Sequence, residues 1–382
     1  MEKFSYLDNA ATTKVFDDVF DFMKQKNEEL FFNPSSSYMP SINVKKQLNL
    51  ARENITQKLG GKNGRLTFTS SATESNNMVF NGFNLRPGQV VLISKGEHPS
   101  VFYAAHALEQ KGVIVKEVNL DKNGKVDFEH FKTLIDDNVV LISVIHVSNE
   151  TGAINDIKCL CEYAKKINPN VIFHSDGVQA FGKIQFSVRD LGVDLYTISS
   201  HKLYAPRGIA GIWIKNSIKI HPYLLGGGQE DGIRSSTENV LGALAFSYVL
   251  DKVFVNINEN YNRVFNYKNC FIKKLMASNI SQFLKINSSE DASPYILSLT
   301  FDKIKGEVLE NMLDRYNIYI STGSACSSKK AGNRTLEAMG KSECDIIGSV
   351  RVSFSPYLDY DFDYIVSKFE ECVLRLENNV KR

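Results

Sequence analysis

Short apolar runs alternate with longer segments of helical pattern through the first two-thirds of the chain. The runs are rich in valine and isoleucine and predict strands at 65–69, 90–93, 113–118, 139–145 and 171–174. A helix is predicted over 41–59, with Ser41 as its N-cap and Gly60 and Gly61 as its C-terminal stop. Near-continuous apolar strands separated by helices are typical of an α/β fold with a mostly parallel sheet that is covered by helices on both faces.

The pattern changes around residues 251–274, where it becomes mostly helical and polar. A smaller set of elements follows, with strands predicted at 296–301, 318–320 and 350–354 and helices at 307–316 and 362–377. At 382 residues the chain is long for a single core. We therefore expect a large domain over 15–255 and a smaller α/β domain formed by 1–14 and 256–382.

The composition is that of an ordinary soluble globular protein, with 43% hydrophobic and 23% charged residues. The formal net charge of +2 gives no strong attraction for nucleic acids or anionic membranes, so neither is expected as a direct partner. The sequence has no apolar stretch of the roughly 20 residues that span a bilayer, and its first residues lack a signal-peptide core. We therefore expect a cytoplasmic protein. No group of cysteines and histidines has the spacing of a metal site, so no metal is predicted.

Lys202 lies between two apolar runs, at 193–198 and 209–214. A lysine held between buried strands loses hydration, and this disfavours its charged form. A neutral amine is what a Schiff base with an aldehyde cofactor requires. The alternative is a lysine at a strand end whose stem packs on the sheet while its ammonium group reaches solvent.

Polar residues follow several of the other predicted strands. Ser71, His98, Asn149 and Asp176 each come shortly after one of them. Each has an ordinary alternative role, as a helix N-cap or a turn residue. Because ligands of such sheets bind at the carboxyl ends of the strands, we expect these residues to gather in one site.

Three other binding motifs are not supported. The segment 177–183 has the glycine and Gly-Lys spacing of a P-loop, but Ile184 stands where that motif needs serine or threonine. The sequence contains no G-x-G-x-x-G and no H-E-x-x-H.

Cys326 lies in a segment of small and polar residues, 320–333, that separates a predicted strand from a helix. Such a segment predicts an exposed loop, and the neighbouring Lys329 and Lys330 favour the thiolate form of the cysteine. The alternative is a surface cysteine without a role.

Taken together, these residues resemble the cysteine desulfurases of the NifS/IscS type, which belong to the fold-type I enzymes of the class V aminotransferase group. The resemblance runs from about Tyr6 to about Ser355 and rests on the order and spacing of many short motifs. They include Asn33-Pro-Ser-Ser36, Ser71-Ala-Thr-Glu-Ser75, Glu97-His98, Asp176-Gly-Val-Gln179, Ser199-Ser-His-Lys202, Arg234-Ser-Ser-Thr237, Gly323-Ser-Ala-Cys326 and Arg351. One departure is Ser236, which stands where the family usually has glycine.

The resemblance implies pyridoxal 5′-phosphate (PLP) as the cofactor, bound in a large domain with a seven-stranded type of sheet. Lys202 corresponds to the lysine that forms a Schiff base with PLP, and Asp176 to the residue against the pyridinium nitrogen. Gln179 corresponds to the residue that hydrogen-bonds the phenolate oxygen, and His98 to the residue that stacks on the ring. The other implied cofactor contacts are Ala72, Thr73, Asn149, Ser199 and His201.

The resemblance also implies the substrate and catalytic residues. Arg351 corresponds to the residue that binds the substrate carboxylate, with Asn149 and Asn33 as further contacts. Lys202, helped by His98, moves the Cα proton, and the Cys326 thiolate attacks the substrate sulfur. Thr237 corresponds to a residue that reaches the phosphate of a neighbouring subunit, which implies a homodimer.

The implied activity is that of a PLP-dependent cysteine desulfurase. Such an enzyme converts L-cysteine to L-alanine and holds the sulfur as a persulfide, here on Cys326, for an acceptor protein of iron–sulfur cluster assembly or tRNA thiolation. The alternatives are a selenocysteine lyase or another class V PLP enzyme, and a non-catalytic sulfur-relay partner that keeps the fold without the cofactor.

Overall fold

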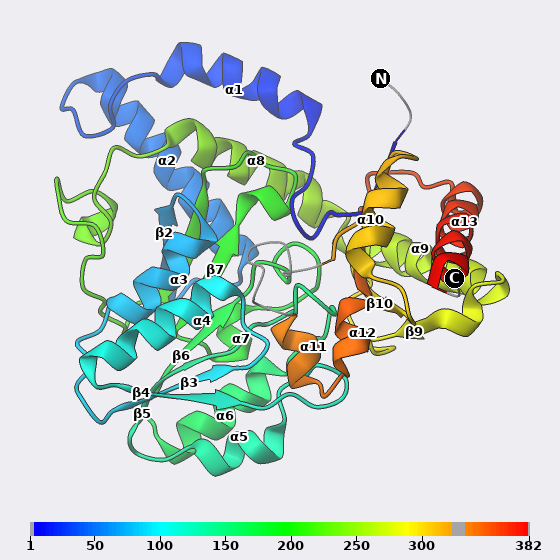
Figure 1. Ribbon diagram of the computed structural model, residues 1–382. Helices are drawn as coiled ribbons and strands as arrows, with labels where there is room; N and C mark the ends of the chain where they lie inside the picture. The colour runs from blue at the N-terminus through cyan, green and yellow to red at the C-terminus, as the bar shows by residue number, and fades with distance from the viewer. Residues whose placement is uncertain (1–3, 323–332, 381–382) are drawn as a thin grey trace.

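Figure 1 shows the protein as a computed structural model that describes residues 4–322 and 333–380. Its largest sheet has seven strands and is mostly parallel. The strands are β2 (Gly64–Thr69), β3 (Val90–Ser94), β4 (Ile114–Val118), β5 (Val139–Ser143), β6 (Ile172–Asp176), β7 (Leu195–Ser199) and β8 (Ala210–Lys215). Their order is β2-β8-β7-β6-β5-β3-β4. In this sheet β8 runs opposite to the other six strands, so the predicted mostly parallel α/β sheet is confirmed.

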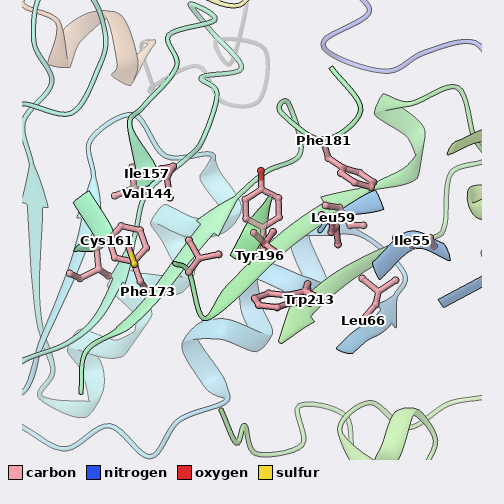
Figure 2. Packing of buried hydrophobic residues seen from close by; sticks show 14 of the residues in the cluster. Ile55, Leu59, Leu66, Val144, Ile157, Cys161, Phe173, Phe181, Tyr196 and Trp213 are labelled. Atoms are coloured by element: carbon pink, nitrogen blue, oxygen red, sulfur yellow. The ribbon is translucent and has the colours of Figure 1, made fainter. Parts of the chain in front are cut away.

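Helices cover both faces of this sheet. They are α1 (Asp17–Leu30), α2 (Met39–Lys58), α3 (Ala72–Asn81), α4 (Pro99–His106), η1 (Ala107–Lys111), α5 (Phe128–Leu134), α6 (Ile157–Ile167), α7 (Val188–Leu191) and α8 (Val240–Val255). Successive residues of a strand point to opposite faces of the sheet. Val90 and Leu92 therefore pack in the hydrophobic cluster on one face, and Val91 and Ile93 in the cluster on the other face. Figure 2 shows part of the cluster that contains Val90 and Leu92, in which Trp213 and Tyr196 are fully buried.

A second core lies in the last third of the chain. Its three-stranded antiparallel sheet consists of β9 (Leu284–Ile286), β10 (Ile296–Phe301) and β12 (Ser349–Ser353). The remaining elements are β11 (Ile318–Tyr319), η4 (Ser281–Phe283), α9 (Ile257–Ala277), α10 (Gly306–Asp314), α11 (Arg334–Ala338), α12 (Glu343–Ile347) and α13 (Phe362–Val380). The N-terminal strand β1 (Ser5–Tyr6) pairs with β11, and Leu7 is buried in this second core. The domain boundaries at 15 and 255 remain a prediction.

One local expectation is wrong. The helix predicted over 41–59 begins at Met39, so Ser41 lies inside it and its N-cap is Tyr38. Pro40 stands in the first turn, where its missing N–H costs nothing and its fixed φ suits a helix. At the other end Gly60 has φ 66° directly after the C-cap, so the predicted glycine stop is confirmed.

Within the described residues, no single helix has the length and apolar composition to cross a membrane. The pair α8 and α9 meets that criterion only when taken together, and the two helices are bent by 72° at their junction.

Candidate active site

A cavity of about 330 Å³ lies at the carboxyl ends of the parallel strands. Its lining includes residues that follow β2, β3, β5, β6 and β7, together with two segments from the second core. The predicted site residues among them are Ala72, Thr73, His98, Asn149, Asp176, Gln179, His201, Lys202 and Arg351. The structure therefore brings most of the predicted site into one place.

Lys202 ends the short helix η2 (Ser200–Lys202), which directly follows β7. Its Nζ donates hydrogen bonds of 2.6 Å to the carbonyl oxygens of Ala10 and Ala11, so the amine points into the cavity rather than to solvent. Burial lowers the pKa of Lys202 to about 8, and the nearby charge of Arg351 acts in the same direction. A larger share of this amine is therefore neutral near pH 7 than for an ordinary lysine.

Asp176 is the last residue of β6 and is almost fully buried. Its Oδ2 accepts a 2.9 Å hydrogen bond from Asn76 Nδ2, and its Oδ1 accepts a 3.0 Å bond from the backbone N–H of Val178. The following residue must be glycine because a Cβ at Gly177 would overlap the ring of Tyr196. The carboxylate thus has a fixed orientation at the cavity wall.

His98 is both a helix cap and a cavity residue. Its Nδ1 accepts a 3.2 Å hydrogen bond from the backbone N–H of Ser100 in the first turn of α4. Burial lowers the pKa of His98, with Asp176 opposing the shift, so the ring is neutral near pH 7. Because a backbone N–H can only donate, Nδ1 is the acceptor, and the proton of the neutral ring lies on Nε2.

The N-terminus of α3 opens onto the cavity at Ala72 and Thr73. Ser71 caps this ten-residue helix by accepting a 3.1 Å hydrogen bond from the backbone N–H of Glu74. The first N–H groups of a helix have no partner inside it and favour anions. His201 lines the same cavity, and its pKa is lowered to about 4 by burial and by Lys202, so it is a neutral hydrogen-bonding group there.

Arg351 enters the cavity from β12 of the second core. Its Nη2 donates a 2.9 Å hydrogen bond to Asp8 Oδ1, and its Nη1 donates a 3.0 Å bond to the carbonyl oxygen of Asn149. Among the described residues, its buried Nε has no hydrogen-bond partner. The guanidinium group therefore keeps a free donor for an anion.

Three predicted site residues within the described chain do not line this cavity. Ser199 is buried at the end of β7, and Asn33 is exposed, with its Oδ1 accepting a 2.9 Å hydrogen bond from the backbone N–H of Ser35. Thr237 lines a separate cavity of about 150 Å³, next to Ser236, whose φ of 143° lies in a region that glycine adopts more easily. Cys326 lies outside the described residues.

Other polar residues at the site were not predicted. Asn76 holds Asp176 and also donates a 2.9 Å hydrogen bond to Ser100 Oγ, while its own buried Oδ1 has no partner within the described chain. It lies one helical turn after Ala72 on the same helix, and this spacing is the feature of the sequence that could have placed Asn76 at the site. Glu97 is fully buried next to His98, and burial raises its pKa to about 8.

The comparisons with known proteins agree with this geometry. Residues 5–361 match the model of the family described as aminotransferase class-V. A protein named cysteine desulfurase IscS from Clostridium botulinum is 34% identical over 96% of this chain and 93% of its own. A solved structure named NifS-like protein has a TM-score of 0.90 and 31% identity, covering 98% of this chain and 100% of its own. A structure of SspA in complex with cysteine has a TM-score of 0.77 and 26% identity over 93% of this chain and 100% of its own.

This protein therefore belongs to the class V aminotransferases, a family of PLP-dependent enzymes, and within it to the cysteine desulfurases. The predicted family and cofactor are confirmed. The residues present fit PLP, since one cavity combines a buried amine of lowered pKa, a fixed carboxylate and a helix N-terminus that suits a phosphate.

Proposed function

We propose that this protein removes sulfur from L-cysteine, releases L-alanine and passes the sulfur to an acceptor protein through a persulfide on Cys326. The observation that carries the proposal is the position of the Lys202 amine in one cavity with Asp176 and the unsaturated guanidinium group of Arg351. The names of the relatives support the same activity.

PLP, when bound, supplies an electron sink that stabilises negative charge at the substrate Cα. Lys202 would hold it covalently, Asp176 would face its ring nitrogen, and Gln179 would donate to its phenolate oxygen. His98 would lie against the ring. The phosphate would be held at the start of α3, by Ala72, Thr73, Ser199 and His201, with Thr237 contributed by a second copy of the chain.

The chain's own residues would bind the substrate and move its proton. Arg351 would bind the cysteine carboxylate, and its contacts with Asp8 and with the Asn149 carbonyl fix the plane of its guanidinium group. Asn33 and Asn149 would be further contacts. The Lys202 amine would take the Cα proton and return it to the substrate skeleton, a role that suits a pKa lowered to about 8. His98, neutral with its proton on Nε2, would assist.

The sulfur step needs no external oxidant. The Cys326 thiolate would attack the substrate sulfur, so an S–S bond forms while the C–S bond breaks and its electron pair goes to carbon. Protonation of that carbon gives alanine. One thiol and one cysteine thus become one persulfide and one alanine, with all atoms accounted for.

A homodimer and a cytoplasmic location are part of the same proposal. Large apolar side chains are exposed on the segment that forms α1 and α2, at one end of the molecule in Figure 1, and a second copy would cover them. They are Phe20, Phe31, Met39, Ile42 and Leu50. The acceptor of the sulfur would be a protein of iron–sulfur cluster assembly or of tRNA thiolation.

The test is alanine and persulfide formation by the PLP-loaded protein. We expect L-cysteine to give equal amounts of alanine and enzyme-bound sulfur, and Lys202→Ala to give neither. Cys326→Ala should keep bound PLP but form no persulfide, whereas Cys344→Ala, which changes an exposed cysteine of the described chain, should behave like the parent. Full persulfide formation by Cys326→Ala would overturn the role of this cysteine. Alanine release from selenocysteine but not from cysteine would favour the selenocysteine lyase instead.

A further inference from the structure

Lys183 lies in the turn that follows β6 and reaches the boundary between two cavities. Its side chain lines a second cavity of about 600 Å³, whereas Gln179, earlier in the same turn, lines the active-site cavity. Gly182 makes this turn possible, since its φ of 69° is one that other residues rarely adopt and a Cβ there would lie 2.7 Å from Leu203. The turn brings the Lys183 amine back onto the Gln179 side chain.

The contact between these two residues fixes the orientation of an amide group. Lys183 Nζ donates a 2.6 Å hydrogen bond to Gln179 Oε1, and both side chains are buried. The protonated amine can only donate, and the carbonyl oxygen of Ala10 on the other side of the amide can only accept, so the amide oxygen faces Lys183. The amide NH₂ then points the other way, where Nε2 donates a 2.9 Å hydrogen bond to the carbonyl oxygen of Ala10 at the cavity wall. Gln179 therefore offers the cavity a donor and not an acceptor.

The surroundings of Lys183 disfavour its charged form, so keeping this amine buried lowers the stability of the fold and a purely structural role does not account for it. It is only 5% exposed, its hydrogen bond goes to a neutral amide, and the charges that act on it are the cations of Lys202 and Arg351. Together with burial they lower the pKa of Lys183 to about 7. The other titratable or charged groups around it are Tyr295, whose ring centroid lies 5.8 Å away, and those that line the second cavity, Lys125, His146, Asp156, Tyr261 and Asp291.

We infer that Lys183 is a positioning residue, which locks the Gln179 amide with its NH₂ toward the cofactor and so sets the proton affinity of bound PLP. The inference rests on the proposed function, because it takes Gln179 as the donor to the PLP phenolate oxygen. A donor at that oxygen withdraws the negative charge that helps to hold a proton on the nitrogen that links Lys202 to PLP. Without Lys183 the amide can turn its oxygen to the phenolate, and this proton is held more tightly.

The test is a pH titration of the visible absorption band of the PLP-bound protein, which requires no turnover. We expect Lys183→Met to raise the midpoint of the titration by about one pH unit, the size of one lost hydrogen bond to a charged group. We also expect the dissociation constant of PLP to rise about tenfold for the same reason. Methionine has a similar volume and replaces a buried charge, so the fold should be retained, and thermal unfolding of the PLP-free protein checks this.

Two control variants separate the orientation of the Gln179 amide by Lys183 from a general effect of the lysine charge. Lys268→Met removes another lysine that is 5% exposed and has its pKa lowered to about 8 by burial, on α9, and should leave the midpoint unchanged. Gln179→Leu should raise the midpoint by itself, and adding Lys183→Met to it should add no further shift, since the lysine acts through the amide. If the shifts of the two single substitutions add up in the double variant, Lys183 acts on the cofactor through space and not through Gln179, and the inference is overturned.

The failure of the inference and that of the proposed function are distinguishable. If the parent protein binds PLP at Lys202, as reduction by borohydride would show, but Lys183→Met leaves the midpoint unchanged, the inference is wrong and the function stands. A parent protein that binds no PLP at all would overturn both.

Discussion

Replacing Glu97 by glutamine tests whether a buried carboxyl group behind the active site keeps its proton in the folded state. Glu97 is fully buried, and burial raises its pKa from 4.5 to about 8. Its Oε1 accepts hydrogen bonds from Ser94 Oγ at 2.5 Å and from the backbone N–H of Ile145 at 2.6 Å. Its Oε2 has no partner among the described residues. Glutamine keeps the accepting oxygen, so the variant mimics the protonated acid.

The expected effect on stability follows from proton linkage. Because the pKa of Glu97 is higher in the folded state, the folded protein holds a proton that the unfolded chain releases between about pH 4.5 and pH 8. The contribution of this group to stability is therefore full below pH 4.5 and falls as the pH rises to about 8. From the two pKa values, the parent should lose about 2.5 kcal/mol relative to Glu97→Gln between pH 5 and pH 7.

The assay is urea unfolding of the PLP-free protein at several pH values, with the difference in unfolding free energy between parent and variant plotted against pH. Glu162→Gln, which changes a 66% exposed side chain on α6, is the control for the removal of one carboxyl group. A difference for Glu97→Gln that does not vary with pH would refute the assignment of a buried, protonated carboxyl group.

Two further predictions concern groups around the cofactor site. Asn76→Leu should lower the free energy of unfolding by about 2 kcal/mol, because Asp176 loses a buried hydrogen bond. The control Asn81→Leu, at an exposed position of the same helix, should change it by less than about 0.5 kcal/mol, and equal losses in urea unfolding would contradict this prediction. The rate at which the PLP-free protein captures PLP should rise with pH and level off above about pH 8, the lowered pKa of Lys202, because the neutral amine is the reactive form. Stopped-flow absorbance measures this rate, and a rate that keeps rising steeply above about pH 9 would show that the pKa is that of an ordinary lysine.

The sequence supplied the candidate residues of this site but not all of their partners. Lys202, Asp176 and His98 were found because each follows an apolar run, and the ends of buried parallel strands meet at one edge of a sheet. Asn76 was missed, since its spacing from Ala72 places it on the same side of the helix but does not indicate that its amide meets Asp176, 100 positions later. The lock between Lys183 and Gln179 was missed because the same residues first suggested an incomplete P-loop.

The strands and helices themselves were largely determined by local pattern, because apolar periodicity is a property of each short segment. The predicted strand at 296–301 is β10, and the strand at 65–69 differs from β2 by one residue. What only the tertiary structure decided is which segments meet. The pairing of β2 with β8 and the approach of Arg351 to Asp8 join parts of the chain that lie far apart. Such pairings depend on how whole faces pack against each other, and no local sequence pattern carries that information.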